Sequence, residues 1–131
     1  MGGYSADEPG RPREAGNILP GEEGQGQIAR LMAALRRQPP AAFAGIPVAF
    51  TDDYSAGVGE ESATGARYPL PLDQANVLHY RFADGGFVMV RPSGTEPKLK
   101  LYFSVVGRSK TEAETRLAAV KADTLARMGL A

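Results

Sequence analysis

The chain of 131 residues is long enough for one domain, and its 15 Lys and Arg residues balance 15 Asp and Glu residues, so no overall charge favours nucleic acid or an anionic membrane. The absence of cysteine excludes disulfides and thiolate sites, and the single histidine, His79, cannot form a metal site or a catalytic triad alone. No apolar run approaches the roughly 20 residues of a membrane span and no signal peptide opens the chain, so we expect a cytoplasmic protein.

Residues 1–24 are rich in Gly, Pro and Glu and contain few apolar residues. This composition predicts a flexible tail or linker rather than part of a packed core. We therefore assign residues 25–131 to one folded domain. A start of this kind is unusual for a mature enzyme, and we expect the chain to be a fragment of a longer protein.

A first helix is predicted by four apolar residues at the spacing of one helical face, namely Ile28, Leu31, Met32 and Leu35. Arg36 and Arg37 suit the C-terminal end of this helix and are predicted to be solvated charges, and two prolines after them stop the helix. An apolar run then predicts a strand near Ile46–Asp53, and a Gly- and Ser-rich composition predicts a long loop over residues 55–68.

A hairpin is predicted by two alternating runs on either side of Asp84-Gly85-Gly86, because these residues favour tight turns. His79 falls on the more polar face of the first run, where a structural or solvent-exposed role is favoured over a catalytic one. The run "LKLYFSVVG", which begins at Leu99, alternates in the same way and predicts a further strand. Ser109–Glu112 is a capping box, which predicts a helix that ends near Met128.

The predicted order of elements is helix, strand, long loop, three strands and helix. This order favours an α+β fold, with an antiparallel sheet of about four strands and two helices packed on its apolar face. A chain of this length can bury one such core.

The stretch "RPSGTEPK", from Arg91 to Lys98, joins the last two predicted strands. The guanidinium of Arg91 is a planar fork that can bind two oxygens of a phosphate. The hydroxyls of Ser93 and Thr95 add donors, and the amide of Gly94 can approach an anion closely because the residue has no Cβ and tolerates a positive φ. Two prolines restrict the backbone and so lower the entropy lost on binding. These residue types predict a phosphate-binding loop, with a polar hairpin turn as the alternative.

Three further charged residues lie in or beside this stretch. The carboxylate of Glu96 would repel a bound phosphate, so we expect it to point away, towards Lys98 or Lys100. The two lysines are either auxiliary contributors to phosphate binding or ordinary residues of the solvent face of the strand.

The segment "RPSGTEPKLKLYF" resembles the phosphate-binding loop in the C-terminal domain of the α-D-phosphohexomutases, which are the phosphoglucomutase and phosphomannomutase enzymes. The family pattern R-x-S-G/N-T-x-P is matched by Arg91, Ser93, Gly94, Thr95 and Pro97. The resemblance covers roughly residues 20–128 and implies the TBP-like fold of that domain. It also implies that the first four of these residues bind the substrate phosphate that is not being transferred.

The resemblance implies that the chain is the substrate-phosphate-binding domain of a phosphohexomutase, an intramolecular phosphotransferase that interconverts hexose 1-phosphate and hexose 6-phosphate. In that family a phosphoserine of another domain donates the phosphoryl group, supported by Mg²⁺ and a hexose 1,6-bisphosphate activator. This chain lacks the serine segment and the aspartate-rich metal loop. We therefore expect no catalytic residue, no metal ligand, no bound cofactor and no activity in the isolated chain. The expected partners are a phosphosugar and the remaining domains of the parent enzyme, without nucleic acid or membrane.

Three alternatives stay open. The parent enzyme prefers either glucose or mannose, and the sequence does not decide between phosphoglucomutase and phosphomannomutase. A free-standing, non-catalytic anion-binding module on the same scaffold is the second alternative. The third concerns "GEESATG", Gly59 to Gly65, which is similar to the "GEESG" sugar-specificity loop of the family's third domain, although its position after the first predicted strand favours an ordinary acidic loop.

Overall fold

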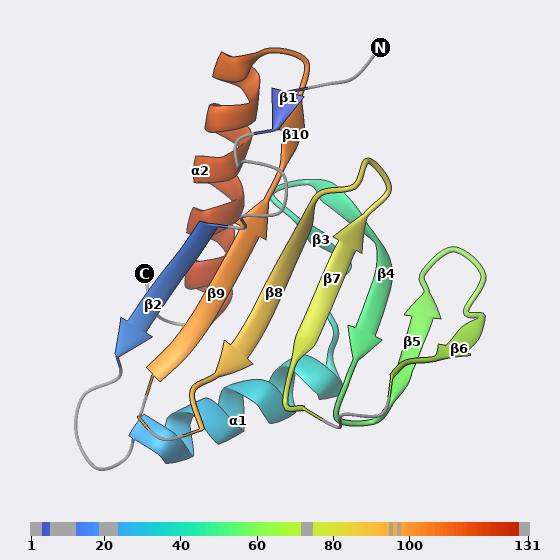
Figure 1. Cartoon of the computed structure of the whole chain (residues 1–131), viewed down its shortest axis with the longest axis vertical. Coiled ribbons are helices and arrows are strands. Elements are labelled where there is room, and N and C mark those ends of the chain that lie inside the picture. Colours follow the sequence, from blue (N-terminus) through green and yellow to red (C-terminus); the bar gives the residue numbers. More distant parts are fainter. Residues whose placement is uncertain are drawn as a thin grey trace.

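The computed structural model describes residues 4–5, 13–18, 24–71, 75–94, 96 and 98–128. The helices are α1 (Gly24–Arg37) and α2 (Lys110–Arg127). The strands are β1 (Tyr4–Ser5), β2 (Arg13–Ile18), β3 (Ala42–Phe43), β4 (Ile46–Asp53), β5 (Val58–Glu61), β6 (Arg67–Pro69), β7 (Leu78–Phe82), β8 (Phe87–Pro92), β9 (Lys98–Ser104) and β10 (Val106–Gly107). Figure 1 shows most of these strands side by side in one twisted sheet.

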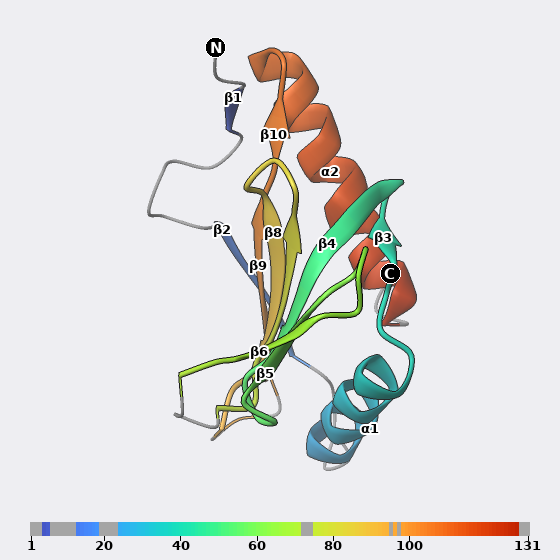
Figure 2. The same ribbon diagram turned by 90° about the vertical axis from the view of Figure 1, so that its right-hand side faces the viewer.

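The centre of the sheet consists of the four strands that the sequence predicts. Among the described residues the sheet has eight strands, in the order β2-β9-β8-β7-β4-β5-β6, with β3 paired to β4. Neighbouring strands run antiparallel. Figure 2 shows both helices on the same side of the sheet. The predicted α+β class, with two helices on one face of an antiparallel sheet, is confirmed, and the sheet has more strands than expected.

Three of the four additional strands of this sheet, β2, β5 and β6, lie where the sequence predicts a tail and a loop. Residues 13–18 form β2, which pairs with β9, and so differ from the flexible tail predicted for residues 1–24. The prediction of a long loop over residues 55–68 is wrong, because β5 and β6 form a hairpin in this part of the chain. The edge of β9 presents backbone N–H and C=O groups that an extended segment can pair with whatever its side chains, so composition does not reveal β2. The predicted division into a tail and a domain at residue 25 stays a prediction.

The hydrophobic core lies between the helices and one face of the sheet. Alternate residues of β7, β8 and β9 are buried there, as the alternation predicts: Leu78, Tyr80, Val88, Val90, Leu99, Leu101 and Phe103. Both helices contribute to the same core, with Ile28 and Met32 from α1 and Leu117 and Val120 from α2.

The other face of the sheet is called the open face below, because neither helix covers it (Figure 2). Its residues alternate with those of the core. They are Phe50 and Asp52 of β4, His79 and Arg81 of β7, Phe87, Met89 and Arg91 of β8, and Lys98, Lys100, Tyr102 and Ser104 of β9.

The predicted hairpin turn and helix cap are both confirmed. Gly85 has a φ of +98° in the turn between β7 and β8, a conformation that other L-residues rarely adopt. Ser109 caps α2 by accepting a hydrogen bond from the backbone N–H of Glu112 at 3.1 Å. The carboxylate of Glu112 accepts from the backbone N–H of Arg108 at 2.7 Å, one residue before the cap.

Candidate functional site

The predicted phosphate-binding loop joins β8 to β9, at the end of the sheet that lies towards α1 (Figures 1 and 2). The ladder between these strands pairs Arg91 with Lys100. Beyond that pair, the backbone N–H of Ser93 donates to the carbonyl oxygen of Lys98 at 2.8 Å. Both arms of the loop are therefore held by the sheet. Thr95 and the second proline lie outside the described residues, and the role predicted for Thr95 stays a prediction.

Arg91 and Lys100 form a pair of like charges on the open face. Because Ser93 and Lys98 occupy a hydrogen-bonded position of the ladder, Arg91 and Lys100 occupy the next one, where Cα atoms lie about 5.5 Å apart. Arg91 is exposed and Lys100 is partly exposed, and neither has an ion pair within the described part of the chain. Like charges directly opposite destabilise a sheet, so an anion bound between them would relieve the repulsion.

Gly94 and Glu96 are both exposed within the loop. The φ angle of Gly94 is not positive, although a glycine could adopt such an angle. Apart from its two chain neighbours, no atom of the described residues lies within 4 Å of the place that a Cβ of Gly94 would occupy, which leaves room there for a ligand. Within the described residues, Glu96 forms no ion pair with Lys98 or Lys100, so the expected contact is not observed.

A second polar cluster on the open face surrounds Asp52, which the sequence did not single out. Arg81 Nε donates to Asp52 Oδ2 at 2.9 Å, and Arg81 Nη2 donates to the Tyr68 hydroxyl at 2.8 Å. The Tyr68 hydroxyl itself donates to Asp52 Oδ1, and the guanidinium lies 4.4 Å from the centre of the Phe50 ring. Burial opposes the charge of Arg81, but hydrogen bonds to Asp52 and Tyr68 outweigh it and raise the pKa of Arg81. This cluster is satisfied within the chain.

Gly59 makes the Asp52 cluster sterically possible. A Cβ at this position would clash with the Tyr68 ring and would lie 2.5 Å from Asp52 Oδ1. Only glycine therefore lets the Tyr68 ring cross β5 to reach β4. The only signal of this cluster in the sequence is an aspartate within a predicted strand. Its partners Tyr68 and Arg81 lie 16 and 29 residues further along the chain, so no local pattern connects the three residues.

His79 lies beside this cluster on the predicted, more polar face. Its Nδ1 is 3.6 Å from Asp52 Oδ2, which is too far for a hydrogen bond, and its ring packs edge-on against Phe87 with centroids 5.0 Å apart. Both ring nitrogens are buried, and neither has a hydrogen-bond partner in the part of the chain that the structure describes. Burial lowers the pKa of His79; Asp52 opposes this shift and Arg81 adds to it. These surroundings fit the structural role predicted for the histidine.

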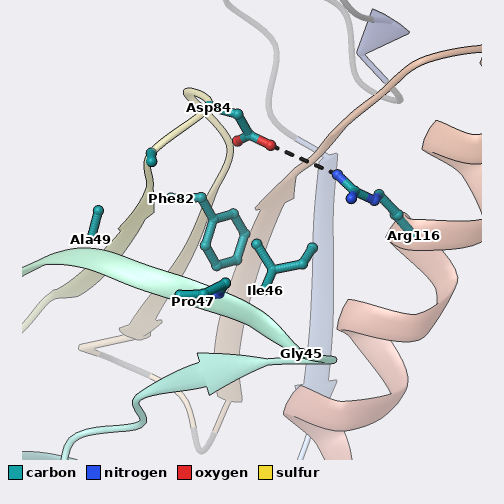
Figure 3. A pocket seen from close by; sticks show the side chains of 8 residues that line it. Gly45, Ile46, Pro47, Ala49, Phe82, Asp84 and Arg116 are labelled. Atoms are coloured by element: carbon teal, nitrogen blue, oxygen red, sulfur yellow. Dashed lines mark ion pairs between the residues drawn. The ribbon is translucent and has the colours of Figure 1, made fainter.

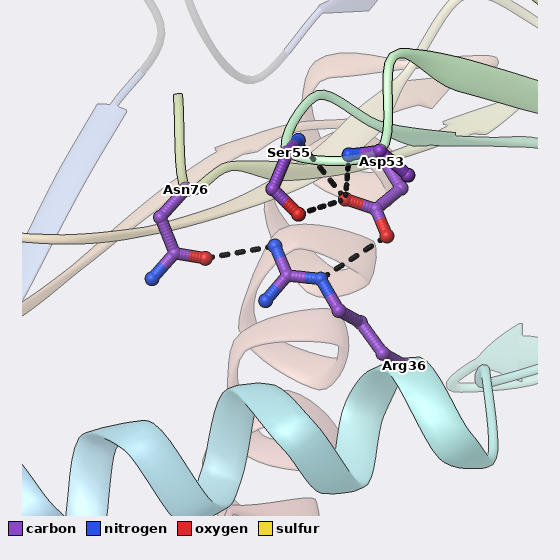
Figure 4. Close-up of polar contacts among 5 residues, drawn as sticks. Arg36, Asp53, Ser55 and Asn76 are labelled. Carbon is purple, nitrogen blue, oxygen red and sulfur yellow. Dashed lines mark hydrogen bonds and ion pairs between the residues drawn. The ribbon is translucent and has the colours of Figure 1, made fainter. Parts of the chain in front are cut away.

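Arg36 is not the solvated charge that the sequence predicts, whereas Arg37 is exposed. Arg36 Nε donates to Asp53 Oδ2 at 3.1 Å and Arg36 Nη2 donates to Asn76 Oδ1 at 2.7 Å (Figure 4). Asp53 Oδ1 accepts from the backbone N–H and the hydroxyl of Ser55 at 3.1 and 2.9 Å. Burial opposes ionisation of Asp53, but the bonds to Arg36 and Ser55 prevail and lower its pKa. The cluster joins the end of α1 to the end of β4.

The stretch Gly59–Gly65 forms the end of β5 and the turn into β6. The Thr64 hydroxyl donates to Glu61 Oε1 at 2.6 Å, and Glu60 pairs with the exposed Arg67 at 3.2 Å. Its carboxylates therefore bind partners within the hairpin, which supports the interpretation as an ordinary acidic segment.

The described cavities lie away from the loop. A cavity of about 320 Å³ lies at the opposite end of the sheet, where Ile46, Pro47 and Phe82 meet Asp84 and Arg116 (Figure 3). Arg116 is already engaged there, at 3.8 Å from Asp84 and through a 2.8 Å bond to the backbone of β10. A smaller cavity of about 200 Å³ lies between α1 and α2. Among the described residues no group of three or more His, Asp or Glu side chains suits a metal ion, and neither helix is long and apolar enough to cross a membrane.

The fold and the loop together define a small α+β domain with a cationic turn at one end of its sheet. Residues 27–123 match the family model described as "Phosphoglucomutase/phosphomannomutase, C-terminal domain". The chain belongs to this family of C-terminal domains, in agreement with the resemblance of its loop.

The chain is similar to part of several much longer proteins. The chain is 40% identical over 95 residues to a phosphoglucomutase of Staphylococcus haemolyticus, covering 72% of this chain and 17% of that protein. It is 36% identical over 93 residues to a probable phosphomannomutase of Haemophilus influenzae, covering 70% and 16%. The open form of pp63/parafusin, a phosphoglucomutase from Paramecium, superposes with a TM-score of 0.52 over 89% of this chain and 19% of that one. At 15% identity this likeness shows the fold alone. The chain spans about a sixth of the length of the curated relatives.

Proposed function

We propose that this chain is the part of a cytoplasmic phosphohexomutase that binds the phosphate of a hexose phosphate, with Arg91 as the bidentate clamp. The observation that carries the proposal is the pair of like charges at Arg91 and Lys100, held by a paired ladder at the base of the loop without an anionic partner in the described residues. The Ser93 hydroxyl and the Gly94 amide add neutral donors at the same place. Of the two auxiliary lysines, Lys100 is favoured because it lies directly opposite Arg91.

In this role the chain contributes positioning rather than bond breaking. Two N–H groups of Arg91 bind two phosphate oxygens, and the ammonium of Lys100 offsets the second charge of a phosphate dianion. Binding the phosphate that does not react supplies energy that the parent enzyme uses at the distant reacting centre. Phosphoryl transfer depends chiefly on such positioning and on charge stabilisation.

The reacting groups belong to other domains of the parent enzyme under this proposal. The phosphoserine, Mg²⁺ and the hexose 1,6-bisphosphate activator act there, and the isolated chain is inactive. In the complete enzyme this domain closes over the substrate as a lid. The relatives carry both the phosphoglucomutase and the phosphomannomutase name, and the choice between glucose and mannose is made outside this domain.

The test is a titration of the 131-residue chain with inorganic phosphate and with glucose 1-phosphate, followed by amide NMR shifts. We expect shifts at Ser93 and Gly94, and we expect Arg91→Ala to weaken binding by about 1.5–3 kcal/mol, the range for hydrogen bonds to charged groups. Arg108→Ala is the matched control, because it removes an exposed arginine that follows β10, far along the chain from the loop. Absence of shifts in the wild-type chain at millimolar ligand, or equal affinity in Arg91→Ala, would refute the assignment.

A further inference from the structure

β7 and β8 separate at the base of the phosphate-binding loop, and a proline explains why. Their ladder ends at Leu78 and Val90, whereas β8 stays paired with β9 as far as Ser93. Because the N–H of Ser93 points to β9, the alternation of an antiparallel strand points the backbone nitrogen of Pro92 towards β7. If the register continued beyond Leu78 and Val90, Pro92 would lie opposite Asn76, but proline has no N–H with which to extend the ladder. The sheet therefore opens between Asn76 and Pro92, one residue before Ser93.

Asn76 is held at this opening by Arg36. Arg36 Nη2 donates to Asn76 Oδ1 at 2.7 Å, and the Arg36 side chain is itself fixed by the 3.1 Å bond to Asp53 (Figure 4). A guanidinium can only donate hydrogen bonds, so the amide oxygen of Asn76 faces Arg36 and its NH₂ group faces away. Asn76 is exposed, and its NH₂ group has no partner among the described residues. Two oriented donors are thus presented beside the loop.

Asn76 and Arg91 belong to opposite faces of this end of the sheet. Arg36 approaches Asn76 from α1, on the helix side, whereas Arg91 lies on the open face. The amide is therefore not placed to share the phosphate oxygens bound by Arg91. A ligand longer than phosphate, anchored on the loop, can extend around the end of the sheet to the amide. Sugar hydroxyl oxygens accept hydrogen bonds of the kind that an amide NH₂ donates.

We propose that Asn76 is a second polar contact of the ligand site, donating to a hydroxyl oxygen of the bound hexose phosphate, and that Arg36 is the positioning residue that orients its amide. The proposal rests on the phosphate-binding function proposed for the loop. It assigns this domain a contact with the sugar as well as with the phosphate.

The experiment compares two ligands on the full chain, inorganic phosphate and glucose 1-phosphate. Phosphate alone reports on the loop, whereas glucose 1-phosphate also reports on contacts with the sugar. We expect Asn76→Ala to weaken glucose 1-phosphate binding about 3- to 10-fold, the loss of one neutral hydrogen bond, and to change phosphate affinity less than about twofold. The ratio of glucose 1-phosphate affinity to phosphate affinity should also fall in Arg36→Met, but by a smaller factor. In that variant the Asn76 amide remains but loses its orientation.

A second variant separates ligand contact from folding. Asn76→Asp keeps an acceptor for Arg36 and so should keep the thermal stability of the wild-type chain, yet it removes both donors. The negative charge of the new aspartate should weaken the binding of both ligands. Because the donors are also lost, we expect the ratio of glucose 1-phosphate affinity to phosphate affinity to fall as in Asn76→Ala. Gln38→Ala, which removes an exposed amide beside the cavity between α1 and α2, is the control and should leave the affinity ratio unchanged.

The outcomes distinguish this inference from the function on which it rests. An unchanged affinity ratio in Asn76→Ala and Asn76→Asp, with phosphate still bound at the loop, overturns the sugar contact and leaves the phosphate site intact. Parallel loss of both ligands in Asn76→Ala also overturns it, since Asn76 would then act only by supporting the loop. Absence of phosphate binding in the wild-type chain overturns the proposed function and this inference together.

Discussion

Arg81 and Arg91 lie on the same open face of neighbouring strands, yet their surroundings are opposite. Arg81 donates to Asp52 and to the Tyr68 hydroxyl, so its charge is neutralised within the chain. Arg91 is exposed and lies opposite Lys100, with no anion among the described residues to pair with. An arginine paired internally holds the fold, whereas an arginine placed against another cation is available to an anionic ligand. The predictions below test this difference.

The largest effect is expected from Asp52→Ala. The side chain of Asp52 is only 4% exposed, and its removal leaves Arg81 and the Tyr68 hydroxyl without their acceptor. Breaking this pair, whose carboxylate is buried and whose guanidinium is partly exposed, should lower the free energy of unfolding by about 3 kcal/mol, the low end of the range for buried pairs. Urea unfolding followed by circular dichroism measures the change. Glu60→Ala, which removes an exposed ion pair, is the control and should cost under about 1 kcal/mol. Equal losses in the two variants would mean that the Asp52 cluster does not hold the fold.

The second effect compares two glycines, one beside each arginine. Gly59→Ala forces a methyl group against the Tyr68 ring and Asp52, and should destabilise the chain by about 2 kcal/mol, within the range for overpacking. The methyl group of Gly94→Ala meets no atom within 4 Å in the described part of the chain, its two neighbours aside, so this variant should keep its stability while binding phosphate more weakly. Thermal unfolding and phosphate titration of both variants check this. If Gly94→Ala were as unstable as Gly59→Ala, the loop glycine would serve the fold and not a ligand.

The contrast between the two arginines was only partly predictable from the sequence. Alternation is a local property, so it placed His79 and the core residues on their correct faces. The loop was also predictable, because Arg91, Ser93 and Gly94 are nearly contiguous in the chain. The partners of Arg81 were not, because Tyr68 lies 13 residues away in a segment predicted as a loop.

The same limit explains the errors about Arg36 and the hairpin. Arg36 binds Asp53 and Asn76, which are 17 and 40 residues distant, whereas local sequence predicts only a solvated arginine at the end of a helix. β5 and β6 contain Gly59 and Pro69, residues that are depleted in strands, and their pairing depends on the edge that β4 offers. Long-range backbone pairing and side-chain contacts of this kind leave no periodic pattern in the sequence.

A smaller effect concerns the proton of His79, next to the paired arginine. Burial lowers the pKa of His79 in the folded chain below its ordinary value of 6.5, so the folded chain binds this proton less readily than the unfolded chain. Its contribution to stability is therefore complete above about pH 6.5 and is lost as the pH falls through the folded-state pKa. We expect the free energy of unfolding to decrease from about pH 7 to about pH 5, and to decrease less in His79→Phe. If the free energy of unfolding fell equally with pH in the wild-type chain and in His79→Phe, His79 would not be buried in its neutral form.

The smallest effect has the opposite sign and concerns Arg91 itself. Replacing Arg91 by Ala removes the repulsion with Lys100, so without phosphate and at low salt the variant should be more stable than the wild-type chain by about 0.5 kcal/mol. Added salt should reduce this gain by screening the two charges. Phosphate should reverse it, because a ligand that binds only the folded state stabilises the wild-type chain and not the variant. Unfolding curves of both proteins, in sodium chloride and in phosphate at equal ionic strength, separate screening from binding. A gain that sodium chloride and phosphate reduce equally would mean that the two cations repel each other without forming a phosphate site.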